Sequence, residues 1–168
     1  MITTKNLILK PVCEDDIDIY SQILSCDDLT KYLPKGAAYT HDEIRLHVQN
    51  RIKHWEHGFG SYVICLKSNP AVKMGYVGVE QCESPIHSDI RYALLPDYQG
   101  SGFVFESAKA VLTETFRTSH LSKIYGVALR ENISSLVIIK KLGMQLESET
   151  RLYGDVEGLE TYSIEKFV

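Results

Sequence analysis

The stretch Tyr98-Gln99-Gly100-Ser101-Gly102-Phe103 separates a strand-like segment, which ends at Leu94-Leu95-Pro96, from a helical segment that begins at about Gly102. Gly100 and Gly102 permit left-handed dihedrals, and they let a ligand approach the backbone where a side chain would obstruct it. The first turn of the following helix leaves amide groups unpaired, and the positive end of the helix dipole lies there. The stretch therefore predicts a pyrophosphate-binding turn.

The segments after this turn alternate strand and helix. Apolar residues recur at helical spacing from Gly102 to about Phe116, which predicts the major helix. Asn132 and Gly143 are suitable end residues for a second helix, although the Val137-Ile138-Ile139 composition between them is typical of a strand. We expect strands at Ile124 to Leu129, Gln145 to Leu152 and Leu159 to Phe167.

The segments before the turn continue the alternation. A first strand at Asn6 to Val12 precedes a helix that stops near Ser25 to Asp28. Thr40 and Glu43 form a capping-box pattern, so a second long helix should start there and end at Gly58. Further strands are expected at Ser61 to Leu66, Met74 to Gln81 and Ser88 to Leu95. This order predicts one mixed α/β domain over residues 1–168.

Composition limits the class of protein. Hydrophobic residues make up 44% and charged residues 24% of the 168 residues, which is typical of a globular domain. The N-terminus lacks the features of a secretion signal and no apolar run is long enough to span a bilayer, so we expect a cytoplasmic protein without a membrane span. The net charge of -4 argues against a nucleic-acid partner. The four cysteines are widely spaced and show no zinc-site pattern.

Sequence motifs narrow the identity of the anion. Neither a P-loop nor a GxGxxG fingerprint after a first strand is present, which disfavours nucleotide hydrolysis and dinucleotide redox chemistry. Tyr98 to Phe103 instead resembles the Q/R-x-x-G-x-G/A acetyl-CoA motif of the GNAT N-acetyltransferases, particularly the branch that modifies ribosomal-protein N-termini. Three more segments resemble that branch in the right order: Asn6 to Pro11, Asp27 to Pro34, and Glu131 to Ser135 running into Lys140-Lys141-Leu142-Gly143-Met144.

The resemblance implies a GNAT fold, with a twisted, mixed, mostly antiparallel sheet of about seven strands flanked by about four helices. Two central strands, Ser88 to Leu95 and Ile124 to Leu129, would splay apart and hold the pantetheine arm of acetyl-CoA, the cosubstrate. Val104 departs from the motif, which has Gly or Ala there, but its spacing directs it toward the core. The residues implied in CoA binding are Leu94, Leu95, Gln99, Gly100, Ser101, Gly102, Phe103, Val104 and Asn132.

Amine acetylation needs a neutral amine, a polarised thioester carbonyl and a proton for the departing thiolate. Glu80 and Asp89 are the candidate bases; either is also explained as a solvated or ion-paired carboxylate, and water is a further candidate for relaying the proton. Ser135 is the candidate general acid, because it matches a serine that this branch uses near the CoA sulfur. Other GNAT enzymes use a tyrosine as the general acid on the same helix, and the matching position here is Ile139. No cysteine has an activating context, so we expect direct transfer in a ternary complex.

The acceptor is the least determined feature. The resemblance favours a protein N-terminal α-amine and places Tyr32 and Tyr39 at the acceptor rim. Small amines such as aminoglycosides and polyamines are the alternative acceptors, and a catalytically silent CoA-binding sensor is the alternative function. The six histidines lack metal-site spacing, so no metal is expected. A monomer and a homodimer are both compatible with the sequence.

Overall fold

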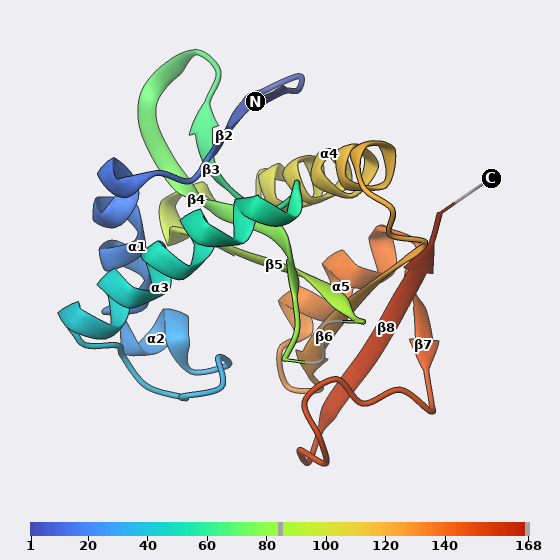
Figure 1. Cartoon of the computed structure of the whole chain (residues 1–168). Coiled ribbons are helices and arrows are strands. Elements are labelled where there is room, and N and C mark those ends of the chain that lie inside the picture. Colours follow the sequence, from blue (N-terminus) through green and yellow to red (C-terminus); the bar gives the residue numbers. More distant parts are fainter. Residues whose placement is uncertain (84–85, 167–168) are drawn as a thin grey trace.

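A computed structural model describes residues 1–83 and 86–166, which form one eight-stranded sheet (Figure 1). The strand order is β1-β2-β3-β4-β5-β6-β8-β7. All neighbouring strands are antiparallel except β5 and β6, which are parallel. The strands are β1 Ile2–Thr3, β2 Leu7–Pro11, β3 Ser61–Leu66, β4 Asn69–Gln81, β5 Ser88–Leu94, β6 Lys123–Leu129, β7 Gln145–Glu147 and β8 Leu159–Glu165.

Helices cover both faces of this sheet (Figure 1). They are α1 Ile17–Leu24, α2 Asp27–Thr30, α3 His41–His54, α4 Phe103–Thr118 and α5 Ile133–Lys141. Helices α1 and α3 pack on one face, in an apolar cluster that includes Tyr20 and Tyr76. Helices α4 and α5 pack on the other face, in a larger cluster that includes Val111 and Ile139. Residues alternate between these two clusters along β3 and β4, as the pleat of a sheet buried on both faces requires.

The two central strands splay apart, as the resemblance predicts. Strands β4 and β5 share seven residue pairs and β6 and β8 share another seven, whereas β5 and β6 are joined only at Asp89 and Tyr125. From that pair the two strands continue in the same direction and separate toward Leu94 and Leu129. The sheet therefore offers unpaired strand edges on either side of the gap.

Local capping signals placed the starts of α3 and α5 correctly. The Thr40 hydroxyl accepts a hydrogen bond from the Glu43 amide (3.3 Å) and the Glu43 carboxylate accepts one from the Thr40 amide (2.7 Å), which completes the capping box of α3. The Asn132 side chain caps α5 and Gly143 follows it with φ 81°. The strand-like composition of Val137-Ile138-Ile139 is therefore outweighed by the caps at both ends.

Several boundaries differ from those expected. Ile2–Thr3 pairs with β2 and adds an eighth strand, and α2 was not anticipated. Strand β7 ends at Glu147 rather than Leu152, because the chain leaves the sheet there and runs to Tyr153, whose hydroxyl bonds to Asp89 on β5. Strand β8 ends at Glu165, and the expected end at Phe167 lies outside the described residues.

Candidate active site

The glycine turn has the geometry of an anion site. Gly100 and Gly102 have φ of 80° and 81°, a region that other L-residues rarely adopt, and Gly102 is the N-cap of α4. The Gln99 amide donates to the Pro96 carbonyl, and the first amide bonded within α4 is that of Glu106, to the Gly102 carbonyl. Among the described residues, no turn or loop carbonyl accepts a hydrogen bond from the backbone amides of residues 100–105. The N-terminus of α4 can thus bind a pyrophosphate.

Val104 does not obstruct this turn with its side chain. Both Phe103 and Val104 pack against the larger core cluster, as the helical spacing predicts. Phe105 lies instead along a groove between α4 and the N-terminal segment, where Glu106 accepts hydrogen bonds from the Thr4 hydroxyl (2.6 Å) and the Asn6 amide (2.7 Å). The extra volume at position 104 is therefore buried in the protein rather than facing the anion site.

The end of β5 connects the turn to the gap between the splayed strands. The Gln99 side-chain amide donates to the Leu94 carbonyl (2.9 Å), and the Leu95 amide donates to the Met74 carbonyl on β4 (2.8 Å). A ligand that uses the Leu94 carbonyl would have to displace the exposed Gln99 side chain. Gly75 lies opposite Leu94, and a Cβ there would come within 2.1 Å of the Ala93 carbonyl oxygen. The close approach of β4 to β5 at this point requires glycine.

The N-terminus of α5 faces the same gap. The Asn132 side-chain oxygen (Oδ1) accepts from the Ser135 backbone amide (3.2 Å), and the Tyr92 hydroxyl on β5 donates to the Ser135 carbonyl (3.2 Å). Burial raises the pKa of Tyr92 to about 12, so it stays protonated. The Ser135 side chain is half-buried and has no hydrogen-bond partner in the part of the chain that the structure describes. Ile139 is only 2% exposed and packs in the larger core cluster.

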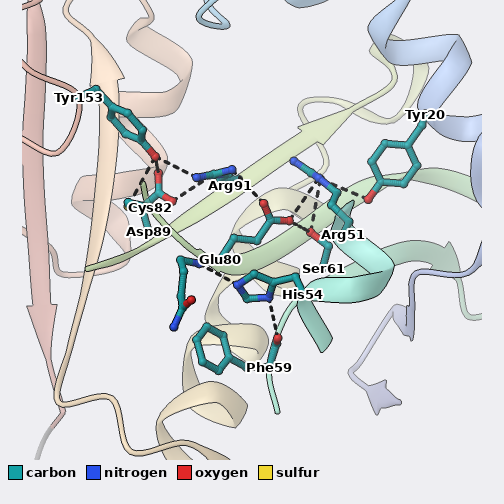
Figure 2. Close-up of polar contacts among 11 residues, drawn as sticks. Tyr20, Arg51, His54, Phe59, Ser61, Glu80, Cys82, Asp89, Arg91 and Tyr153 are labelled. Atoms are coloured by element: carbon teal, nitrogen blue, oxygen red, sulfur yellow. Dashed lines mark hydrogen bonds and ion pairs between the residues drawn. The ribbon is translucent and has the colours of Figure 1, made fainter. Parts of the chain in front are cut away.

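The two candidate bases lie in a buried ionic group on the α1/α3 face, shown in Figure 2. We call this group the arginine–carboxylate cluster; it consists of Arg51, Glu80, Asp89 and Arg91. Glu80 is 2.9 Å from an Arg91 Nη and 3.2 Å from Arg51 Nε, and it accepts a 2.5 Å hydrogen bond from the Ser61 hydroxyl. Arg91 Nε donates to Asp89 (2.9 Å). Two cations and two anions thus balance in the interior.

The two carboxylates have opposite electrostatics. Burial alone would raise the pKa of Glu80, but Arg51 and Arg91 lower it to about 2. Burial raises the pKa of Asp89, although Arg91 and the Tyr153 hydroxyl act against that rise. Glu80 therefore stays ionised and fully bonded near neutral pH, whereas Asp89 is the more basic carboxylate.

Three residues of this site were not anticipated from the sequence: Arg51 on α3, Arg91 on β5 and Tyr153 in the loop between β7 and β8. The Tyr153 hydroxyl donates to Asp89 (2.6 Å) and accepts from an Arg91 Nη (3.0 Å), so it ties this loop to the cluster. The one local signal was the position of Arg91, two residues after the candidate base Asp89. Arg51 and Tyr153 are distant in sequence and carried no signal.

The remaining predicted residues lie nearer the surface. Tyr32 is 36% exposed, and Tyr39 is half-buried against the α1/α3 cluster. His54 is committed to the fold, because Nδ1 contacts the Phe59 carbonyl (2.9 Å) and Nε2 accepts from the Gln81 amide (2.9 Å). Burial lowers the pKa of His54, which agrees with a neutral ring. Over residues 1–83 and 86–166, no three metal-ligating side chains gather, and no helix is long and apolar enough to cross a bilayer.

Comparison with known proteins agrees with this geometry. A family model described as "Acetyltransferase (GNAT) domain" matches residues 6–145. An uncharacterized N-acetyltransferase of Bacillus subtilis, YnaD, is 25% identical over 146 residues, which are 87% of this chain and 83% of that protein. The structure of an acetyltransferase from Agrobacterium tumefaciens superposes with a TM-score of 0.87 at 17% identity, over 98% of this chain and 94% of that one.

Two further structures carry acceptors in their names. One is an acetyltransferase from Salmonella typhimurium that modifies the N-terminal serine of ribosomal protein L7/L12; its TM-score is 0.78 at 19% identity, over 98% and 97% of the two chains. The other is spermidine N-acetyltransferase from Vibrio cholerae in complex with CoA and spermine; its TM-score is 0.77 at 17% identity, over 96% of each chain. At these identities the similarity shows the fold.

Proposed function

Because this chain belongs to the GNAT acetyltransferase family, and is therefore an acetyl-CoA-dependent acyltransferase, we propose that its favoured acceptor is a protein N-terminal α-amine. The observation that carries the cosubstrate assignment is the row of amides at residues 100–105, near the end of β5, for which the described residues supply no acceptor. The preference for an α-amine rests on the segments that resemble the ribosomal-protein branch. The L7/L12 enzyme among the similar structures is compatible with it.

We assign the cosubstrate contacts as follows. The pyrophosphate binds the amides at the N-terminus of α4, where the helix dipole and the absence of side chains at Gly100 and Gly102 favour an anion. The pantetheine arm lies between β5 and β6, with Leu94 and Leu95 on one side and Asn132 on the other. The thioester then lies near Ser135.

Transfer is direct in this proposal. The neutral amine attacks the thioester carbonyl carbon, a C–N bond forms, and the C–S bond breaks. The amine proton passes through water to Asp89, which is only 4% exposed and whose pKa is raised. The Ser135 hydroxyl donates a proton to the departing thiolate and regains one from solvent, so the serine ends the reaction neutral. Glu80 is the poorer base, because Arg51 and Arg91 hold its pKa at about 2.

A covalent route through cysteine is disfavoured. Burial raises the pKa of Cys82 to about 11, and it also raises the pKa values of Cys13 and Cys65. A thiol becomes a useful nucleophile when its pKa is lowered. An acyl-cysteine intermediate is therefore not part of the proposed mechanism.

The test combines binding and turnover. Calorimetry with acetyl-CoA should show binding, and a thiol-release assay should show turnover on short peptides with free N-termini, compared with spermidine and an aminoglycoside as the small-amine alternatives. Tight binding without turnover on any amine would support a silent CoA sensor instead. If acetyl-CoA does not bind, neither function holds.

A further inference from the structure

The arginine–carboxylate cluster lies on the face from which an acceptor must approach. The pyrophosphate turn belongs to α4, which covers the other face. Since the pantetheine arm is assigned to the gap between β5 and β6, an acceptor reaches the thioester from the α1/α3 side. On that side Glu80, Asp89 and Arg91 stand on the adjacent strands β4 and β5, in register from Gly78–Arg91 to Glu80–Asp89.

Exposure differs sharply within the cluster. The side chains of Arg51, Glu80 and Asp89 are 5%, 7% and 6% exposed, whereas that of Arg91 is 33% exposed. The side chain of Arg91 is therefore the member of the cluster that is most accessible to solvent. The two anions are screened by a cation that bonds to both of them.

Arg91 is also the member that connects the cluster to the loop between β7 and β8. One Nη donates to Glu80 (2.9 Å), Nε donates to Asp89 (2.9 Å), and the other Nη donates to the Tyr153 hydroxyl (3.0 Å). Figure 2 shows Arg91 between Glu80 on one side and the Asp89–Tyr153 pair on the other. Arg51 lies beyond Glu80 and bonds to Tyr20 (3.2 Å). Within the described cluster, Arg91 is thus the one cation that neutralises the two carboxylates on the side nearer to solvent.

We propose that Arg91 is a specificity-determining residue that disfavours polyamine acceptors and favours amines with no second positive charge nearby. The inference rests on the proposed acetyl transfer and names the acceptor class for the same site. With Arg91 present, the two carboxylates and two guanidiniums sum to zero and a cation faces the acceptor. Without it the cluster carries a net charge of -1, which attracts a polycation.

The test replaces the charge of Arg91 and compares two acceptors. Arg91→Met removes the charge, and Arg91→Lys retains it. Arg117→Met is the matched control, because Arg117 is exposed on α4, pairs only with Glu114 among the described residues, and changes the net charge of the protein equally. The measurements are the Kd of spermidine for the CoA-loaded protein by calorimetry, and kcat/KM for spermidine and for a tripeptide with uncharged side chains.

In Arg91→Met, spermidine should bind about tenfold more tightly than in the native protein at low salt, and the spermidine-to-tripeptide ratio of kcat/KM should rise by about the same factor. Both effects should shrink at 0.5 M salt, because exposed charges are screened. Arg91→Lys and Arg117→Met should stay close to the native ratio. If Arg91→Met fails to fold, Arg91→Gln carries the same expectation and keeps a hydrogen-bond donor for Glu80.

An unchanged spermidine Kd and an unchanged ratio in a folded Arg91→Met protein with native CoA affinity would overturn the inference. Equal losses on both acceptors would also overturn it, because they indicate a purely structural role. If the native protein acetylates no peptide, the proposed acceptor is wrong. The spermidine Kd still decides the role of Arg91 in that case.

Discussion

Replacing Glu80 with glutamine tests whether this carboxylate stabilises the fold rather than acting as a base. Glu80 is buried between Arg51 and Arg91, and both guanidiniums lose an anionic partner in Glu80→Gln. Arg51 is 5% exposed, so its charge would remain in the interior without a counter-charge. Breaking a buried pair from one side costs about 3–5 kcal/mol.

The pKa of Glu80 leads to a similar value for the stability that would be lost. A fall from 4.5 to about 2 corresponds to about 3 kcal/mol in favour of the ionised form in the folded protein. Because the folded pKa is depressed, this stabilisation is present above about pH 4.5 and is lost as the pH falls toward 2. Glu80→Gln should therefore be about 3 kcal/mol less stable than the native protein at pH 7, and the difference should narrow below pH 4.5.

Urea unfolding measures this difference in the free energy of unfolding, with the fluorescence of Trp55, the single tryptophan, as the signal. Its indole N–H donates to the Ser61 carbonyl (3.0 Å), so the reporter lies beside the cluster. With a slope of about 2 kcal/mol per M, the midpoint should fall by about 1.5 M. Glu114→Gln, which breaks an exposed pair worth about 0–1 kcal/mol, is the control. Equal midpoints for native and Glu80→Gln proteins would refute the reasoning.

Four further substitutions probe the site. Gly100→Glu should reduce acetyl-CoA affinity at least a hundredfold in calorimetry, because it puts a negative charge at φ 80° in the anion site; native affinity would remove the pyrophosphate assignment. Ser135→Ala should lower kcat about tenfold or more with acetyl-CoA affinity nearly intact, and an unchanged kcat would exclude the acid role. Asp89→Asn should lower kcat and remove the loss of kcat/KM that protonation of Asp89 causes as the pH falls; a persisting acid limb would assign the proton to another group. Gly75→Ala should destabilise the protein by about 3 kcal/mol or more in urea, because its Cβ would meet the Ala93 carbonyl; native stability would show that β4 and β5 can separate there.

Much of the fold followed from local chemistry. The capping box at Thr40 and Glu43 placed the start of α3, and Asn132 with Gly143 placed α5 despite its β-branched residues. The two glycines of the turn were expected to adopt positive φ and do so. Helix caps and glycine turns depend on residues that are close together in the chain, so they can be recognised from the sequence alone.

The candidate bases show where local reasoning ends. Glu80 and Asp89 are acidic residues near strand ends, and the sequence explained each of them either as a catalytic base or as a solvated or ion-paired carboxylate. Arg51, which lies 29 positions before Glu80 in the chain, lowers the pKa of Glu80. Burial raises the pKa of Asp89, and Tyr153, which lies 64 positions after Asp89, acts against that rise. A pKa depends on charges and burial within a few ångströms, and only folding decides which charges those are.

The turn from Tyr98 to Phe103 and its neighbours thus determined the class of fold, the family resemblance and the prediction of a CoA-binding turn, because backbone conformation and unpaired amides are properties of a few consecutive residues. The tertiary structure alone decided that β5 and β6 keep just one residue pair, Asp89 with Tyr125. It alone also decided that Arg91 joins Glu80, Asp89 and Tyr153. These features depend on contacts between residues distant in sequence, and such contacts form only when the sheet and its helices pack together.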